Sequence, residues 1–471
     1  MNFVSFGFCL FLAATYGLYW LLPRNAGRKL FLLAASYLFY AAWDWRFCGL
    51  MGFVTGNAYI AGRLLAVCGG KARRHVLWLS IGTDLAVLGW FKYAGFVAAS
   101  AASGLTFLGL DVALPIPDIL LPVGISFYTF HAISYVVDVH RGKAAAARNP
   151  LNVALYIAFF PQLVAGPIVR ASSFMPQLGR VPPYSSTGHA LGLRLMLKGL
   201  IYKAVIADNL AALADPVFTD IGRYGDHALV TATIAFYGQV YFDFAGYSAL
   251  AIGTARLFGY RIPKNFDYPY SALSVTEFWR RWHMSLSFWL RDYVYISLGG
   301  NRGPAWQFYR NLMATMVLGG LWHGASWNFV LWGVLHGLGL CLHKLWLKLR
   351  GCLRLGIDWE GWAWCGIALL ITQSWVMVGW VFFRCTSYAD AIDVLKALVG
   401  QRHAAGLTMP DAGSWILALI AADHLIGRFP TPQRLPPALT RPIYWTGIGA
   451  LAAVLLACLP LVQKAFIYFQ F

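Results

Sequence analysis

The sequence predicts an all-α protein that crosses a membrane many times, and two observations carry that prediction. Hydrophobic residues make up 59% of the 471 positions and charged residues only 12%, about half of the charged share that is usual in a soluble domain. Apolar segments recur that are long enough for a spanning helix, which takes about 20 residues. Because no long hydrophilic block separates them, we expect a single integral-membrane domain over residues 1–471.

Apolar length and loop charge together place the first five spans. The loops between these spans alternate between basic clusters, such as the one at Arg24, Arg28 and Lys29, and an acidic loop with Asp111 and Asp118. Since basic loops stay on the cytoplasmic side, the N-terminus is expected to face outward. The spans are expected at residues 4–22, 30–43, 47–67, 76–98 and 119–139.

The later loops continue this alternation. Residues 214–226 are acidic, 344–354 are basic, 385–411 are mixed and 428–441 are again basic. Spanning length and loop charge together predict about eleven spans in all. We expect the C-terminus to face outward as well.

The net charge and the cysteines exclude several classes of function. A formal net charge of +18 would suggest nucleic acid as the partner of a soluble protein. In a membrane protein, cytoplasmic loops that face anionic lipid explain the same charge, so we expect a lipid bilayer and no nucleic acid. The eight cysteines are scattered without a CxxC pair, so neither a disulfide framework nor a metal site is expected.

Two stretches depart from the spanning pattern. The first, FFPQLVAGPIVR at 159–170, places Pro161, Gly166 and Pro167 inside an apolar run. Proline interrupts the helical hydrogen-bond ladder, and irregular backbone at membrane depth survives only when it is buried in protein or lines water. A bent or re-entrant segment is therefore predicted here.

The second stretch concentrates charge in an apolar context. Five formal charges between residues 277 and 292 would cost roughly 15 kcal/mol at the centre of a bilayer, against about 4 kcal/mol returned by the large apolar residues there. This stretch must therefore lie at the interface or line a cavity. Its aromatic residues recur at helical spacing, which predicts an amphipathic interfacial helix in which Glu277 pairs with Arg281.

Two histidines in this region are candidate catalytic groups. His323 lies in GGLWHGASWNF, where Gly320 and Gly324 allow another helix to approach closely, and His283 lies beside the aromatic stripe. A buried neutral imidazole is suited to remove a hydroxyl proton, because its pKa lies near neutrality. The alternative is a packing seam with one hydrogen-bonded histidine. Structural roles are expected for the remaining histidines of the apolar segments, His131, His140, His336 and His343.

Other chemistries have little support. The chain has only two glutamates, and no P-loop, GxSxG or HExxH motif is present. A proton-coupled transporter that uses Arg291, Asp292 and the histidines remains an alternative, as does a non-catalytic membrane scaffold.

Five motifs in order resemble those of the membrane-bound O-acyltransferase superfamily, in its bacterial alginate O-acetyltransferase-like branch. They read LPVGISFYTFHAISYVVDVHRG, FFPQLVAGPIVR, FDFAGYSALAIGTARLFGYRIPKNFDYPY, FWRRWHMSLSFWLRDYVYISLGGNR and GLWHGASWNFVLWGVLHG. The motif core covers about 120–340. The resemblance implies about eleven helices around a central tunnel, with the essential histidine of the family at His323 and its second motif histidine at His283.

The resemblance also implies a reaction and partners. We expect acetyl transfer from a cytoplasmic thioester such as acetyl-CoA, with no bound cofactor, to an extracytoplasmic polysaccharide through a periplasmic acetyltransferase partner and an export complex in the inner membrane. D-alanyl transfer to a cell-wall polymer is the alternative acyl transfer. Tunnel-lining candidates are Trp282, Ser285, Arg291, Asp292, Trp327 and Asn328, and donor-phosphate candidates are Lys264, Arg280, Arg281 and Arg302.

Overall fold

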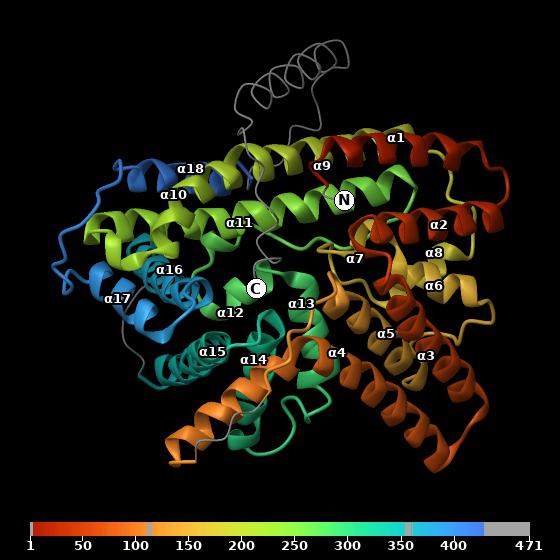
Figure 1. Ribbon diagram of the computed structural model, residues 1–471, viewed down its shortest axis with the longest axis horizontal. Coiled ribbons are helices and arrows are strands. Elements are labelled where there is room, and N and C mark those ends of the chain that lie inside the picture. Colours follow the sequence, from red (N-terminus) through yellow and green to blue (C-terminus); the bar gives the residue numbers. More distant parts are fainter. Residues whose placement is uncertain (1–2, 111–114, 354–358, 360, 428–471) are drawn as a thin grey trace, which may run out of the picture. The chain divides into compact units, whose positions relative to one another are not determined.

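The computed structural model describes residues 3–110, 115–353, 359 and 361–427 (Figure 1). Within these ranges the regular elements are helices, and the strand-type pairing is confined to one isolated bridge between Tyr224 and Leu407. Four of the described helices are long and apolar enough to cross a membrane. Two shorter apolar helices, Phe6–Leu21 and Gly413–Ile426, accompany them. The structure therefore confirms an all-α membrane protein.

The described chain forms two compact units. The first contains the described residues of 3–196 together with 249–263, and the second contains residues 197–248 together with the described residues from 264 onward. Helices α9 (Ser186–Leu200) and α11 (Asp226–Leu257) contribute residues to both units.

The first unit contains the five helices that apolar length predicts. The helix at 47–67 has the predicted ends. The helix predicted at 76–98 is longer in the structure, because it also includes basic residues before position 76 and an alanine-rich segment after position 98. Helix α5 packs against both α3 and α4, and its residues are almost all buried. The helices of this unit are α1 (Phe6–Leu21), α2 (Asn25–Asp44), α3 (Phe47–Val67), α4 (Gly70–Phe107), α5 (Ile125–His140), α6 (Pro150–Ala158), α7 (Phe160–Leu163) and α8 (Ala171–Leu178).

The predicted bend at 159–170 is confirmed. The helix ends at Ala158, the short α7 follows, and the irregular backbone after it is buried. Side chains satisfy this backbone: Tyr156 donates its hydroxyl to the Val169 carbonyl at 2.8 Å, and the Val169 N–H donates to His131 Nε2 at 3.2 Å. His131 therefore has the structural role that the sequence favours, because it holds a buried N–H that no helix satisfies.

The second unit contains a run of helices that meet at the charged stretch. Figure 1 shows α14 and α15 side by side, and they pack closely along their length. Its helices beyond α9 and α11 are η1 (Ile201–Ala207), α10 (Asp208–Thr219), η2 (Ile221–Arg223), η3 (Pro269–Ser271), α12 (Val275–Arg281), α13 (Met284–Trp289), η4 (Leu290–Tyr295), α14 (Ala305–His323), α15 (Trp327–Leu353), α16 (Trp362–Arg384), α17 (Tyr388–Leu398) and α18 (Gly413–Ile426).

Several predicted loops are partly wrong, and another lies outside the described residues. Helix α2 already begins at Asn25, α10 continues to Thr219 into the predicted loop 214–226, and α17 (Tyr388–Leu398) lies within the predicted loop 385–411. The basic residues at 344–350 belong to α15, which continues to Leu353. Lysine and arginine suit the last turns of a helix because they complement its dipole and extend long aliphatic stems over apolar surface. The basic cluster at 428–441 and the apolar segment after it are outside the described part of the chain.

The predicted close approach at Gly320 is confirmed. A Cβ atom placed on Gly320 would lie 2.2 Å from the Phe329 carbonyl oxygen, and one on Gly333 would lie 2.6 Å from the Met316 carbonyl oxygen. The absence of side chains at these two positions lets α14 and α15 touch backbone to backbone, which fixes the turn between them.

Replacing Gly320 by alanine is expected to destabilise the protein. Overpacking costs about 1–3 kcal/mol, which exceeds the gain of about 1 kcal/mol in helix propensity. Thermal unfolding of the purified protein in detergent measures the effect. The matched control is Gly17→Ala in α1, where nothing lies within 4 Å of the added methyl group. A Gly320→Ala protein that unfolds at or above the temperature of this control would contradict the expectation.

Candidate active site

The predicted interfacial helix over 277–292 is broken at Trp282 and His283. Helix α12 is capped by Ser274, whose hydroxyl accepts from the Glu277 N–H at 3.1 Å, and it ends at Arg281. At this point a residue that precedes α12 in the chain takes the place of the next helical hydrogen bond: the Asp267 N–H donates to the Arg281 carbonyl at 2.9 Å. The prediction of one continuous helix is wrong because these long-range bonds compete with the helical ladder.

The break places His283 in an unusual backbone conformation. Its φ of 40° lies in the left-handed region, which few residues other than glycine adopt, although histidine is among the more tolerant. The Met284 N–H donates to the Asn265 carbonyl at 2.9 Å and stabilises this conformation. Helix α13 begins directly after His283, so the imidazole lies at the start of a new helix rather than on the flank of an old one.

A buried amide fixes the tautomer of His283. Asn265 Oδ1 accepts from the Ser285 N–H at 3.2 Å and from the Ser285 hydroxyl at 2.9 Å, while Nδ2 donates to the Ser248 hydroxyl at 3.0 Å. His283 Nδ1 lies 3.1 Å from the same Oδ1 and must therefore carry the proton. Nε2 then has a lone pair, and it has no hydrogen-bond partner among the described residues. Burial lowers the pKa of His283 to about 3, so the ring is neutral.

The structure brings His323 next to His283. The centroids of the two rings are 6.5 Å apart, and both side chains are buried. Three aromatic rings also pack against His323: the ring centroids of Trp322, Trp332 and Phe383 lie 4.9, 4.9 and 5.3 Å away. An imidazole in this low-dielectric setting is held in place by ring packing.

His336 belongs to the same aromatic cluster. Its ring lies 4.7 Å from that of Trp332, which also contacts His323. Trp279 Nε1–H donates to His336 Nδ1 at 3.3 Å, so the proton of the neutral ring is on Nε2. Nε2 faces Gly379, because a Cβ atom there would lie 2.7 Å from it. This is a packing position between α15 and α16, which fits the structural role that the sequence favours.

The other tunnel-lining candidates divide between buried and exposed positions. Trp282 is fully buried, with its ring centroid 4.8 Å from that of Trp380, and Ser285 joins the hydrogen bonds of Asn265. Asn328 is buried and donates to the Cys385 carbonyl at 2.7 Å. By contrast, Trp327 is 62% exposed, and the exposed Arg291 forms an ion pair of 2.7 Å with Asp292. These last three side chains are not part of the buried histidine cluster.

The donor-phosphate candidates differ in how they are paired. Lys264 Nζ lies 2.5 Å from Asp267, and Arg281 forms the predicted ion pair with Glu277 at 2.7 Å. Arg280 and Arg302 are exposed. Among the described residues, no group of three histidine, cysteine, aspartate or glutamate side chains is placed to hold a metal ion.

Sequence reasoning missed Asn265 and Ser248, which position His283. Asn265 stands between Lys264 and Phe266, where the charged and aromatic neighbours dominate the pattern. Asn265 could have been recognised from the sequence as an amide side chain in a short segment that is predicted neither as a helix nor as an exposed loop. An amide that is fully buried in such a segment almost always holds a specific polar partner.

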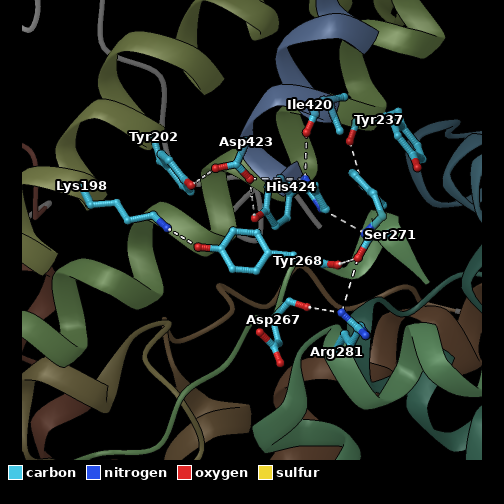
Figure 2. Close-up of polar contacts among 12 residues, drawn as sticks. Lys198, Tyr202, Tyr237, Asp267, Tyr268, Ser271, Arg281, Ile420, Asp423 and His424 are labelled. Atoms are coloured by element: carbon cyan, nitrogen blue, oxygen red, sulfur yellow. Dashed lines mark hydrogen bonds and ion pairs between the residues drawn. The ribbon is translucent and has the colours of Figure 1, made fainter. Parts of the chain in front are cut away.

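A second polar cluster anchors α18 beside this stretch (Figure 2). Asp423 accepts hydrogen bonds from the hydroxyls of Tyr202 and Tyr241, and His424 Nε2 accepts from the Tyr270 N–H at 3.1 Å. A backbone N–H that donates to Nε2 requires a neutral His424, so its contact with Asp423 is not an ion pair between full charges. This cluster ties α18 to the segment 268–271 that leads into α12.

Comparison with known proteins assigns the chain to a family. The family model described as MBOAT, membrane-bound O-acyltransferase family, matches residues 124–355. The chain is 44% identical to the "Probable alginate O-acetylase AlgI" of Azotobacter vinelandii over 82% of this chain and 74% of the relative. It is 37% identical to the protein of the same name from Pseudomonas putida over 98% of both chains. It is 35% identical to the "Peptidoglycan O-acetyltransferase" of Helicobacter pylori over 79% and 74%.

The matched region contains α12, α13, α14 and α15 and therefore both His283 and His323, whereas Phe383 of the surrounding aromatic cluster lies beyond it. The resemblance of the five motifs is thereby confirmed over most of the chain. The chain belongs to the membrane-bound O-acyltransferase family, and it is a membrane-embedded O-acyltransferase.

Proposed function

We propose that His283 and His323 form the centre at which an acetyl group passes from a thioester to a hydroxyl group. The observation that carries this proposal is the 6.5 Å separation of two buried imidazoles, one of which presents a lone pair at Nε2. His323 acts as the general base for the reacting hydroxyl, and His283 Nε2 accepts a hydrogen bond from a neighbouring hydroxyl group of the acceptor and so orients it.

The transfer of the acetyl group balances in atoms and charge when His323 carries the proton from the hydroxyl group to the thiolate. The hydroxyl oxygen attacks the thioester carbonyl carbon while His323 takes its proton. The C–S bond then breaks, and His323 returns the proton to the departing thiolate. No side chain of the cluster is an obvious nucleophile, which favours direct transfer over an acyl-enzyme. The surrounding tryptophan rings exclude water that would hydrolyse the thioester.

The names of the relatives guide the choice of substrate. We infer acetylation of an extracytoplasmic polysaccharide, either alginate-like, cellulose-like or peptidoglycan, with acetyl-CoA as the donor. A periplasmic acetyltransferase partner and a polysaccharide export complex would receive the group at the inner membrane. About eleven spans around a tunnel would connect the two sides, which exceeds the four long apolar helices of the described residues.

The donor phosphates need basic side chains that are not already paired. Arg280 and Arg302 are exposed, whereas Lys264 and Arg281 already form ion pairs with carboxylates. We therefore propose Arg280 and Arg302 as the first contacts of the coenzyme A phosphates. Arg291, Asp292 and Trp327 are assigned to the entrance rather than to the reaction centre.

Transfer of labelled acetyl groups tests the function. Purified protein in proteoliposomes is supplied with acetyl-CoA labelled in the acetyl group, together with polysaccharide or the partner protein, and the labelled product is counted. We expect labelled O-acetyl ester and free coenzyme A. Movement of an intact solute without any labelled ester would support the transporter alternative, and label from a D-alanyl carrier alone would support D-alanyl transfer.

Asn265 provides a test of the tautomer argument. Asn265→Ala removes the acceptor of the Nδ1 proton, and the loss of a buried hydrogen bond of about 1–3 kcal/mol is expected to lower kcat by about 10- to 100-fold. Asn265→Asp keeps the acceptor and is expected to retain more activity. Because a carboxylate raises the pKa of His283, and only neutral His283 accepts a hydrogen bond, the acid limb of its pH–rate profile is expected to shift to higher pH.

The pH profile separates this role from simple packing. Asn265→Asp with an unshifted acid limb, or Asn265→Ala with unchanged kcat, would show that Asn265 does not control the imidazole. Abundance in the membrane is measured for each variant so that loss of folded protein is not mistaken for loss of kcat.

A further inference from the structure

A cavity of about 400 Å³ in the first unit has a basic lining. Three arginines contribute to it, Arg180, Arg256 and Arg261, together with the buried His189. No aspartate or glutamate is among the described residues that line it. The cavity lies where the end of α11, the segment after α8 and the first turn of α9 come together.

Arg180 and Arg261 are exposed at the cavity, and Arg256 is partly buried. Within the described chain, none of the three forms an ion pair, and Arg256 Nε is buried without a hydrogen-bond partner. Burial, and after it the charge of Arg261, lowers the pKa of Arg256. Like charges held together in this way repel each other unless an anion lies between them.

The protein fixes the position of one of these arginines. Gln177 bonds to both backbone polar groups of Arg261: the Arg261 N–H donates to Gln177 Oε1 at 2.8 Å, and Gln177 Nε2 donates to the Arg261 carbonyl at 2.9 Å. A guanidinium on a fixed backbone loses less freedom when it binds a ligand, so this contact preorganises the cavity.

The start of α9 contributes a second, independent feature. The Ser185 hydroxyl accepts from the Gly188 N–H at 3.1 Å and begins the helix at the cavity wall. His189 is only 7% exposed, and its Nδ1 lies 2.6 Å from the Ser185 carbonyl, so Nδ1 carries a proton. Its Nε2 has no hydrogen-bond partner among the described residues. A helix N-terminus attracts anions, and this buried nitrogen lacks the partner that buried polar atoms require.

We propose that this cavity binds a phosphate group. Arginine forks match phosphate oxygens, the N-terminus of α9 adds a positive partial charge, and His189 Nε2 either accepts from a P–OH or, once protonated, donates to a P–O⁻. Two sources carry this chemistry: the headgroup of an anionic phospholipid and a soluble phosphate compound. The proposal does not depend on the acetyl-transfer function.

The surroundings favour the lipid headgroup. The His189 ring stacks on Tyr184 at 4.4 Å and lies 5.3 Å from Trp20, and Tyr184 is exposed. Tyrosine and tryptophan concentrate at the level of lipid headgroups. Arg28, in the first turn of α2, donates to the Pro182 carbonyl at 3.2 Å, so the cavity lies next to a basic cluster that the charge pattern assigns to the anionic leaflet.

Binding to the purified full-length protein in a zwitterionic detergent tests the proposal. One arm titrates short-chain phosphatidylglycerol, with short-chain phosphatidylcholine as the neutral comparison, and the second arm titrates inorganic pyrophosphate. The change in tryptophan fluorescence and isothermal titration calorimetry report Kd. Replacing two guanidiniums in Arg180→Gln/Arg261→Gln is expected to raise Kd by about 10-fold or more, since each charge-assisted hydrogen bond contributes substantially.

The matched control removes the same charge elsewhere in the same unit. Arg74 and Arg148 are exposed and lie outside the cavity lining, so Arg74→Gln/Arg148→Gln is expected to change Kd by less than about twofold. His189→Gln leaves the arginines in place and is expected to raise Kd by at least about threefold. This variant decides the question if the double arginine variant does not fold.

The possible outcomes distinguish a lipid headgroup from a soluble phosphate compound as the ligand, and both from the absence of a phosphate site. Selective loss of phosphatidylglycerol binding in the cavity variants identifies the site with a lipid headgroup. Selective loss of pyrophosphate binding identifies it with a soluble phosphate. Absence of binding by the wild-type protein in both arms, or equal losses in the cavity and control variants, would overturn the proposal.

Discussion

His323→Ala is expected to lower acetyl transfer by about 10²- to 10⁴-fold, because a positioned general base contributes about that much to a rate. His323 lies within an aromatic shell and beside His283, and alanine leaves no group there that could take the hydroxyl proton. The measurement is the initial rate of label transfer by proteoliposomes that contain equal amounts of folded protein.

His336→Ala is the matched control for this change. Both variants remove the same atoms from the same buried cluster, since Trp332 contacts both rings. A packing defect alone would therefore affect both variants similarly, whereas loss of a base affects only His323→Ala. Retention of activity within about fivefold in His323→Ala would be incompatible with general-base catalysis by this residue. Full activity of both His323→Ala and a His283 variant would support the scaffold alternative.

Lys203→Met is expected to cost about 3–5 kcal/mol of stability, because it would strand two carboxylates in the interior. Lys203 Nζ lies 2.7 Å from Asp208 and 2.8 Å from Asp243, and the exposed fractions of these three side chains are 2%, 1% and 2%. Lys203 lies in the π-helical turn η1, and its side chain reaches Asp243 on α11. The measurement is thermal unfolding in detergent, together with the yield of folded protein.

The exposed ion pair of α17 is the matched control. Lys396 Nζ lies 3.9 Å from Asp393, and both side chains are about half exposed. Lys396→Met removes one positive charge from a solvent-exposed position and is expected to change the free energy of unfolding by less than about 1 kcal/mol. A triple change of Lys203→Met, Asp208→Asn and Asp243→Asn is expected to recover part of the loss, because no carboxylate remains unpaired. Equal unfolding temperatures for Lys203→Met and Lys396→Met would contradict the expectation that loss of the buried lysine destabilises the protein through the two carboxylates left in the interior.

Features that depend on local pattern could be predicted from the sequence. Apolar length alone places α3 at its observed ends, and proline and glycine positions indicate the bend after Ala158. Gly320 is recognisable as a point of close approach, because a residue without a side chain in an apolar helix is typical of helix contact. The ion pair of Glu277 and Arg281 follows from their separation by four residues.

Features that depend on distant partners could not be predicted in the same way. The break at Trp282 and His283 arises because the segment around Asn265 forms hydrogen bonds with residues that lie well beyond one helical turn along the chain. Aromatic periodicity continues across the break and gives no sign of it. His283 and His323 come close together because α14 brings the second motif back to the first. The residue spacing within either motif does not indicate this path of α14.

Backbone geometry also decided which predicted residues reach the cluster. Trp327 and Asn328 are neighbours, yet at the start of α15 one side chain points outward and the other bonds to the Cys385 carbonyl. A motif alone assigns both to one site, but successive helical positions differ in direction by about 100°.

The left-handed conformation of His283 has a consequence for the interpretation of any set of variants at this position. Two independent demands act on one residue: an imidazole nitrogen for the substrate, and a φ of 40° for the chain that turns into α13. Valine or isoleucine would meet neither demand, alanine would be strained, and glycine would meet only the second. Asparagine tolerates the conformation without supplying the ring, so His283→Asn isolates the chemistry, whereas most other substitutions also report the cost of bending the backbone.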